Sequence, residues 1–378
     1  VIYAAVTYTL LLLMYASNNL PYSALSGVLT GDMGERNSIS SIRFVAVMFA
    51  QFFVQVFMLP IIEYAGHGDK AAGIEAVMTW LAIIGTAMLL ITFFTTRERI
   101  VPTEAQKSTL KEDLSDLVKN KPWIIMLVTT ILIFITLAMK GGSYVYYFNN
   151  YVDAAALTSF ISPITSSLTA VGINFFGSDP ISAGFGLFNA GGIIFMLVGI
   201  GFSKGLADKY GKRDVFSSAL FVSTLFILFF IFYKPESVVI MFISQILHGF
   251  FYGITIPILW VLIADVADYS EWKTNRRATA IIFSAMMVGL KSGLSIGGAL
   301  VTWILGQYGY INKETVAAGQ EIIQPETVAT GAKMLVSVYA SIPFFLVVAL
   351  LFFYEINKKK EVLIEKELSE RRKASIKN

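Results

Sequence analysis

The run "FSAMMVGLKSGLSIGGAL", from Phe283 to Leu300, is apolar and rich in glycine, and its one charged side chain is Lys291. The apolar segment around it, 279–306, is long enough for a helix to cross a bilayer. Lys291 lies ~18 Å into this segment, where a lysine costs roughly 2.5–3.5 kcal/mol to insert. The stretch therefore predicts a membrane helix whose charge faces protein or water.

Similar apolar runs occur along the whole chain, which is 56% hydrophobic and only 15% charged. Such a composition indicates a membrane protein, and helices are expected because they satisfy their own backbone hydrogen bonds. The sequence contains no cysteine, which excludes disulfides and thiolate metal sites. We expect nine spans, at 5–28, 43–65, 74–96, 123–149, 182–203, 214–233, 237–264, 279–306 and 330–354.

The basic residues are distributed unevenly between the two ends of these spans. Of 29 Lys and Arg, 23 fall in the segments 29–43, 97–121, 204–213, 273–277 and 358–378. Because basic segments stay in the cytoplasm, the first span is predicted to end there, and so is the C-terminus. The tail is then a solvated helix beside anionic lipid, or alternatively a partner-binding segment. The outer segment 150–181 is expected to be an ordered cap or to lie on the membrane surface.

The helical face that carries Lys291 is small and polar, since Ser284, Ser295, Gly298 and Thr302 fall on it. This pattern favours a residue that faces a transport cavity. A structural lysine that bridges two helices is the alternative.

A second lysine, Lys140, also falls within a span and shares a helical face with three tyrosines. Aromatic rings with polar tips suit a hydroxylated ligand. An aromatic belt at the membrane surface would explain the two outer tyrosines but not the lysine. This face comprises Thr136, Lys140, Tyr144, Tyr147 and Tyr151.

Two further helical faces carry polar residues, which either contact a ligand or pack against other helices. The first span has polar residues in its middle. It is also predicted to be kinked, because Pro21 removes a backbone hydrogen-bond donor. Its face contains Tyr8, Tyr15, Asn19 and Tyr22, with Asn18 beside it. The second stripe comprises Gln245, His248, Tyr252 and Thr255.

Acidic residues occur only at span ends or in loops, so the two buried lysines have no mid-membrane carboxylate partner in this chain. Two histidines are too few for a histidine metal cluster, and no metal site is predicted in this chain. No nucleophile–base set is apparent, which argues against an enzyme.

Four stretches resemble a known family. "GLADKYGKRD", Gly205–Asp214, resembles the cytoplasmic loop motif of the major facilitator superfamily, although Lys204 stands where that motif has glycine. "ADVADYSEWKTNRRATAIIFS", Ala264–Ser284, is similar to the glycoside–pentoside–hexuronide:cation symporters, the melibiose-permease family. "NNLPYSALSGVLTGDMGERNSISSIR", Asn18–Arg43, and "KGGSYVYYFNNYV", Lys140–Val152, match the same family.

The resemblance implies an all-α polytopic membrane protein with the major facilitator superfamily fold of twelve helices in two six-helix bundles. The first span then corresponds to the family's fourth helix, so that nine of twelve helices are present. The first three, which carry the cation-site carboxylates in the family, are expected upstream. The implied domains are a partial N-terminal bundle (1–96), a cytoplasmic linker (97–122), a six-helix bundle (123–356) and a basic tail (357–378).

The resemblance also assigns roles to residues. Asn19 takes the place of a sugar-binding aspartate, so the family's α-galactoside specificity is not implied, and Arg43 and Lys291 match functional basic residues. The predicted substrate-binding set is Tyr15, Asn18, Asn19, Tyr22, Arg43, Lys140, Tyr144, Tyr147, His248 and Lys291. The predicted cytoplasmic gate is Asp208, Arg213, Asp265, Asp268 and Arg277.

The function implied is symport of a sugar or glycoside with Na⁺ or H⁺ by alternating access, at a site near the membrane midplane. We expect a monomer in a bacterial inner (cytoplasmic) membrane, with no cofactor besides the coupling ion and no nucleic-acid partner. A lipid or lysolipid carrier and a non-transporting sensor are the alternatives. The tyrosine, asparagine and lysine faces disfavour the former, and the short tail disfavours the latter.

Overall fold

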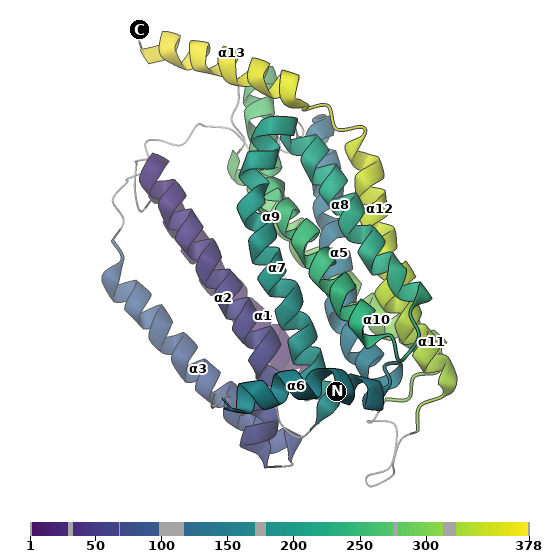
Figure 1. Cartoon of the computed structure of the whole chain (residues 1–378). Helices are drawn as coiled ribbons and strands as arrows, with labels where there is room; N and C mark the ends of the chain where they lie inside the picture. Colours follow the sequence, from purple (N-terminus) through teal and green to yellow (C-terminus); the bar gives the residue numbers. More distant parts are fainter. Residues whose placement is uncertain are drawn as a thin grey trace. The chain divides into compact units, whose positions relative to one another are not determined.

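The computed structural model describes residues 2–28, 33–67, 69–97, 117–170, 179–274, 279–312 and 323–376, and within these ranges it is helical with no strand. A helix forms at each of the nine predicted spans (Figure 1). They are α1 (Ile2–Val28), α2 (Met33–Gly66), α3 (Lys70–Thr95), α5 (Lys121–Asn150), α7 (Pro180–Tyr210), α8 (Lys212–Leu228) with the short helix η1 (Phe229–Phe232), α9 (Val238–Thr274), α10 (Thr279–Gln307) and the run from α11 (Glu326–Met334) to α12 (Ala340–Leu351).

Seven of these helices are long and apolar enough to cross a membrane: α3, α5, α7, α8 with η1, α9, α10 and the α11–α12 run. The described part of α1 contains a shorter apolar stretch, Ala5–Tyr15. The α11–α12 run contains a π-helical segment, η3 (Leu335–Tyr339). The predicted all-α polytopic architecture is confirmed.

The chain divides into two compact units, and the division falls between Lys107 and Ser108. In unit 1, α2 packs against α3 and contacts α1. The closest approach is at Gly73, where a Cβ atom would lie 2.1 Å from the carbonyl oxygen of Ile62. Asp69 caps the start of α3 by accepting hydrogen bonds from the amides of Ala71 and Ala72.

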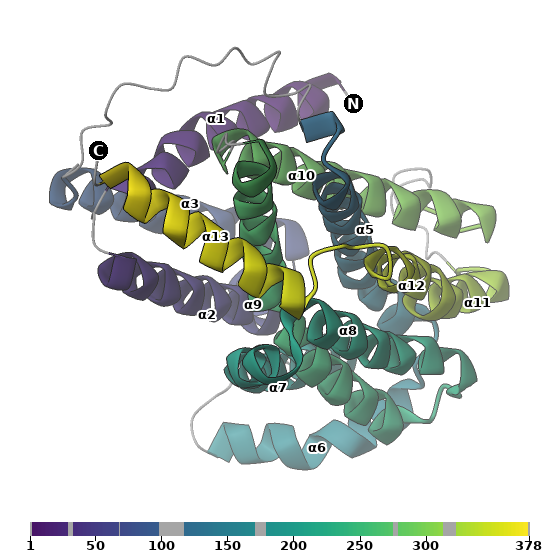
Figure 2. The same ribbon diagram turned by 90° about the horizontal axis from the view of Figure 1, so that it is seen from above.

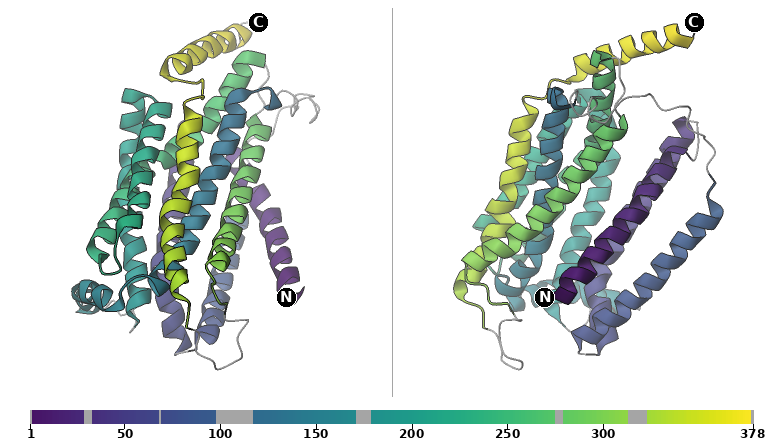
Figure 3. Two further views of the ribbon diagram at one scale, coloured as in Figure 1. Left: turned by 90° about the vertical axis from the view of Figure 1, so that its right-hand side faces the viewer. Right: turned by 180° about the vertical axis from the view of Figure 1, so that it is seen from behind.

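Unit 2 contains α5 and the helices that follow it, and glycines set its closest contacts. A Cβ at Gly253 of α9 would lie 2.1 Å from the carbonyl oxygen of Met196 on α7. A Cβ at Gly293 or at Gly297 of α10 would lie 2.5 Å from a carbonyl oxygen of α5, which runs beside α10 (Figure 3). Small residues allow membrane helices to approach backbone to backbone, which compensates for the missing hydrophobic driving force between them.

Two further helices lie across opposite ends of the unit 2 bundle (Figure 1). The segment that was expected to cap the outer side forms α6 (Ala154–Ala170), which packs against α7 and α9. The basic tail forms α13 (Lys358–Ile376), which contacts α9 and begins beside that helix in the view from above (Figure 2). We call the end of unit 2 that carries α13 the basic end.

Acidic residues at the span ends serve as helix caps. Asp153 accepts a hydrogen bond from the amide of Ala156 at the start of α6. Asp179 accepts from the amides of Ile181 and Ser182 at the start of α7. A carboxylate satisfies the free amides of a helix N-terminus and complements its dipole, so these acids have a structural role.

Candidate functional site

Polar side chains from α5 and α9 meet in the interior of unit 2. The Tyr144 hydroxyl donates a hydrogen bond to Oε1 of Gln245, with 3.0 Å between the oxygens. The ammonium nitrogen of Lys140 lies 5.6 Å from the centre of the Tyr144 ring, within range of a cation–π contact. Lys140 is half-buried, whereas Tyr144 is 2% exposed. We call Lys140, Tyr144, Gln245 and His248 the interior cluster.

His248 completes the interior cluster on α9, one turn from Gln245. Its Nδ1 lies 2.8 Å from the hydroxyl of Ser223 on α8 and 3.0 Å from the carbonyl oxygen of the same residue. The imidazole ring stacks on Tyr252, with 5.8 Å between the ring centres. The histidine is therefore held by two helices and oriented by a stacked ring.

Glycines of α7 and α9 make room for the interior cluster. A Cβ at Gly192 would lie 2.6 Å from Nε2 of Gln245. Gly249, next to His248, packs against the carbonyl oxygen of Gly192. A larger residue at Gly192 would displace the Gln245 side chain, and one at Gly249 would push α9 away from the backbone of α7. The close packing of α7 on α9 therefore positions Gln245.

The tyrosine face predicted on α5 is turned mostly into the bundle. Tyr147 is 0% exposed, and its hydroxyl lies 3.6 Å from the sulfur of Met241. Tyr151 donates a hydrogen bond to the carbonyl oxygen of Tyr233. Thr136 donates to the carbonyl oxygen of Ala340, at the end of the π-helical segment. Each hydroxyl of this face contacts protein, and Tyr144 links the face to Gln245 of α9.

The face of α10 that carries Lys291 is exposed in unit 2. Ser284, Ser295 and Thr302 are exposed together with the lysine, whereas Gly293 and Gly297 are buried against α5. The two sides of this helix thus differ: Gly293 and Gly297 pack on α5, and the polar side chains lie on the exposed side. We call Ser284, Lys291, Ser295, Gly298 and Thr302 the open face of α10.

The remaining predicted binding residues belong to unit 1. Tyr15, Asn18 and Tyr22 are exposed on α1. The side chains of Asn19 and Arg43 lie outside the part of the chain that the structure describes.

At the basic end, the predicted gate residues make contacts within unit 2. Asp265 pairs with Lys212, 2.9 Å away, and Lys212 also pairs with Glu361 of α13 at 2.7 Å. Arg213 pairs with Asp214 and donates to the carbonyl oxygen of Tyr354. Lys212 therefore joins the ends of α8, α9 and α13.

The other gate positions are Asp208, Asp268 and Arg277. The carbonyl oxygen of Asp208, in the last turn of α7, accepts a hydrogen bond from Lys358. Asp268 is half-buried, three residues along α9 from Asp265. Arg277 lies outside the described residues.

Helix α13 is attached to the basic end by polar and apolar contacts. The indole nitrogen of Trp272 donates to Glu367, and Arg371 donates to the carbonyl oxygen of Trp272. Ile364 and Leu368 of the same helix are buried. The tail, which was predicted to be a solvated helix, therefore packs against the bundle along one face.

Just before α13, Glu355 accepts a hydrogen bond from Lys360, which lowers the pKa of the carboxyl group. The pair is largely exposed, so its contribution to stability is small. Among the described residues, no three His, Asp or Glu side chains gather into a possible metal site.

Sequence reasoning left three important residues out of the predicted sites. Gln245 was recognised only as part of a stripe, and its partner Tyr144 is 101 positions away. Ser223 carries no signal of its own in an apolar span. Lys212 belongs to the recognised loop motif, but only the fold brings it to Asp265. The glycine spacing Gly249–Gly253 is the one signal that could have indicated close packing beside His248.

Long apolar helices and polar side chains paired across them define a multi-pass helical membrane protein. Residues 1–178 and 168–358 match the family described as MFS/sugar transport protein. The chain belongs to this family, as the sequence motifs predicted.

Named relatives agree with this assignment. The chain is 32% identical to the inner membrane symporter YicJ of Escherichia coli K12, over 82% of this chain and 61% of the relative. It is 29% identical to the putative glycoside/cation symporter YagG of the same organism, over 99% of this chain and 74% of the relative. It is 25% identical to the isoprimeverose transporter of Lactiplantibacillus pentosus, over 84% of this chain and 61% of the relative. The chain thus spans between three-fifths and three-quarters of the length of these relatives.

Proposed function

We propose that this protein is a secondary transporter that moves a sugar or glycoside together with Na⁺ or H⁺ by alternating access. The observation that carries the proposal is the open face of α10. One side of that helix packs on α5 through glycines, while the other presents Lys291 and several hydroxyl groups that unit 2 leaves exposed. The family and the names of its relatives support a sugar or glycoside as the cargo.

In this proposal, Lys291 donates hydrogen bonds to substrate hydroxyls or pairs with an acidic group of the cation site. Ser295 donates to the Lys291 carbonyl oxygen of its own helix, which leaves its hydroxyl oxygen able to accept from a sugar. A flat, polar face of this kind suits a ligand that is rich in hydroxyl groups.

The interior cluster would provide the second contact surface. Lys140 is half-buried, so a ligand can approach the cluster from its side, with the Tyr144 ring held by Gln245 behind it. His248 and Tyr147 would then act by positioning Gln245 and Tyr144. Tyr15, Asn18, Asn19, Tyr22 and Arg43 of unit 1 complete the proposed binding set.

The gate proposal concerns the basic end, which we place in the cytoplasm of a bacterial cell together with the C-terminus. Asp208, Arg213, Asp265, Asp268 and Arg277 would form ion pairs in one transport state and release them in the other. The proposed domains are those of the sequence: a bundle within 1–96, a linker at 97–122, a six-helix bundle at 123–356 and a tail, in a monomer.

Counterflow in vesicles tests the proposal. Vesicles that contain the full-length protein are loaded with one unlabelled glycoside at a time, and entry of the same labelled glycoside is followed with and without Na⁺ and at two external pH values. We expect exchange of at least one glycoside, with faster or tighter uptake when the coupling ion is present. Exchange of lysophospholipids but of no glycoside would replace this proposal with an amphiphile carrier.

A further inference from the structure

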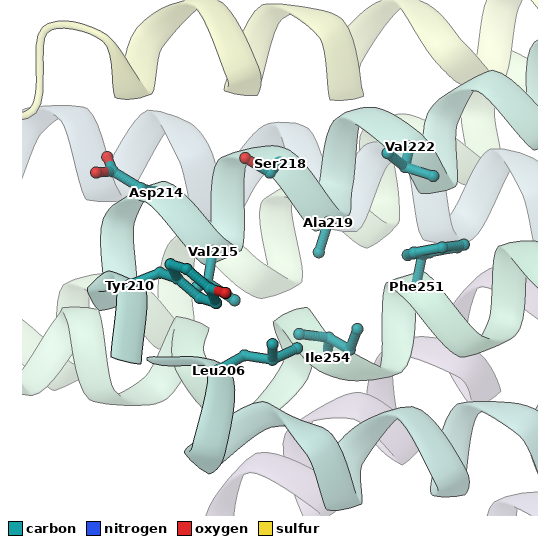
Figure 4. Close-up of a pocket in the computed structure, with 9 residues that line it drawn as sticks. All are labelled: Leu206, Tyr210, Asp214, Val215, Ser218, Ala219, Val222, Phe251 and Ile254. Carbon is teal, nitrogen blue, oxygen red and sulfur yellow. The ribbon is translucent and has the colours of Figure 1, made fainter. Parts of the chain in front are cut away.

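A groove on the surface of unit 2 begins at the basic end, where α7, α8 and α9 meet. It encloses about 450 Å³. Tyr210 and Asp214 lie at one end of it, and Val222 and Phe251 lie at the other (Figure 4). None of the predicted substrate-binding residues lines this groove. It is therefore separate from the proposed sugar site.

The groove runs along α8, the direction in which a lipid acyl chain would lie beside a spanning helix. Asp214 and Val222 both lie on α8, eight residues apart, so the groove extends ~12 Å along that helix. Half of the hydrocarbon core of a bilayer measures ~15 Å. The groove therefore runs from the level of the helix ends into the apolar layer of one leaflet.

Below its mouth the wall of the groove is apolar except for Ser218, with Val215, Ala219 and Ile254 buried along it. A sugar would leave most of its hydroxyl groups without partners there, whereas an acyl chain would contact mainly apolar atoms. Since the groove lies on spanning helices, the hydrocarbon of the bilayer is the apolar material available to fill it.

The mouth carries charges that match a phosphodiester. The Lys209 ammonium lies 5.0 Å from the centre of the Tyr210 ring, and Arg213 pairs with Asp214 at the rim. The Lys212 ammonium group does not add to this charge, because it forms ion pairs with Asp265 and Glu361. Lys358 satisfies the last carbonyl groups of α7. Arg213 also donates to the carbonyl oxygen of Tyr354, so Lys209 carries most of the positive charge available at the mouth.

We propose that this groove is a binding site for one glycerophospholipid of the leaflet at the basic end. One acyl chain fills the groove between Val215 and Phe251, and the phosphodiester lies at the mouth beside Lys209 and Arg213. The Tyr210 hydroxyl supplies a hydrogen-bond donor at the boundary between the headgroup and the chain, a position typical of tyrosine at membrane interfaces.

Native mass spectrometry of the full-length protein in detergent tests the proposal, with palmitoyl-oleoyl phosphatidylglycerol as the added probe. We expect one phospholipid to be retained by the wild-type protein. Ser218→Phe, at an exposed position on the groove wall, should weaken retention about tenfold, because loss of two buried methylene groups already has that effect. Lys209→Gln should weaken it about fivefold. Gly201→Phe is the matched control, since a side chain there meets nothing within 4 Å.

Dioleoylglycerol, which lacks the phosphate, should be retained at least fivefold less well than the phospholipid. Equal retention of the two lipids would overturn the headgroup assignment. Retention by Ser218→Phe equal to that by wild type would overturn the groove as the site, as would a peptide found in place of lipid. If Ser218→Phe does not fold, Lys209→Gln decides, and unchanged retention in that variant would refute the proposal.

Discussion

The interior cluster and the open face of α10 look alike in sequence but differ in structure. Both are polar stripes with a lysine in a span that is otherwise apolar. In the cluster, Tyr144, Gln245 and His248 are buried and hydrogen-bonded across helices. On the open face, the side chains of Lys291, Ser295 and Thr302 are exposed in unit 2. In the interior cluster the buried polar side chains thus contribute to packing and leave Lys140 as the accessible side, whereas the open face of α10 presents its polar side chains outward from the bundle.

The strongest test of this comparison removes the close packing on which the interior cluster depends. Gly253→Leu would force side-chain atoms into the Met196 carbonyl of α7, and α7 and α9 would have to separate. We expect a loss of ~3 kcal/mol or more in unfolding free energy, at the upper end of overpacking effects. Size-exclusion profiles and thermal unfolding in detergent measure it. Gly201→Leu, on the open side of α7, should behave like wild type, and equal damage from both variants would contradict the packing role.

A second variant addresses the open face without touching the core. Lys291→Ala should abolish accumulation of substrate against a gradient, because the face loses its charged hydrogen-bond donor. Removing a costly charge from a span leaves insertion intact, so the protein should remain in the membrane. Uptake in vesicles and membrane yield are the two readouts. Val288→Ala, exposed on the same helix, is the control. Normal accumulation by Lys291→Ala would remove this residue from the mechanism.

His248→Leu probes the buried side of the comparison. The Ser223 hydroxyl would lose its imidazole partner and keep the longer bond, 3.3 Å, to the backbone carbonyl oxygen of residue 248, so we expect a cost of ~1 kcal/mol. We expect a lower unfolding temperature and a smaller effect on transport than that of Lys291→Ala. The opposite order, with full stability and lost uptake, would make His248 a ligand-binding residue.

The smallest expected effect is a difference in stability between two tyrosine variants on the same face of α5. Tyr144→Phe removes the hydrogen bond to Gln245 and should cost ~1 kcal/mol of stability. Tyr147→Phe removes only a 3.6 Å contact to the Met241 sulfur, so its cost should be smaller. Thermal unfolding of the two variants side by side measures the difference. An equal cost would indicate that the Tyr144–Gln245 bond contributes no more than the sulfur contact.

The spans could be predicted from the sequence because apolar length is a property of each segment alone. The polar face of α10 around Lys291 could also be predicted, since its residues recur at helical spacing. The direction in which the tyrosine face of α5 points could not, because the same face suits a cavity or a bundle interior. Contacts such as Tyr144–Gln245 and Lys212–Asp265 depend on which helices become neighbours, and residue spacing carries no information about that.

The length of α9 determines how far a small rotation of the helix would move the residues at its ends. Its 37 residues form a rod of ~55 Å, longer than the ~30 Å hydrocarbon core. Gln245 lies near one end and Asp265 ~30 Å further along it. A pivot of about 5° at Gln245 would sweep Asp265 through ~3 Å, as far as its whole distance from Lys212. Pro257 lies between them, where a missing backbone hydrogen bond makes bending easier. A rotation at the interior cluster would reach Asp265 in full when α9 turns as one rod, because a bend at Pro257 would absorb part of it. The stiffness of this helix would therefore decide whether the ion pair opens.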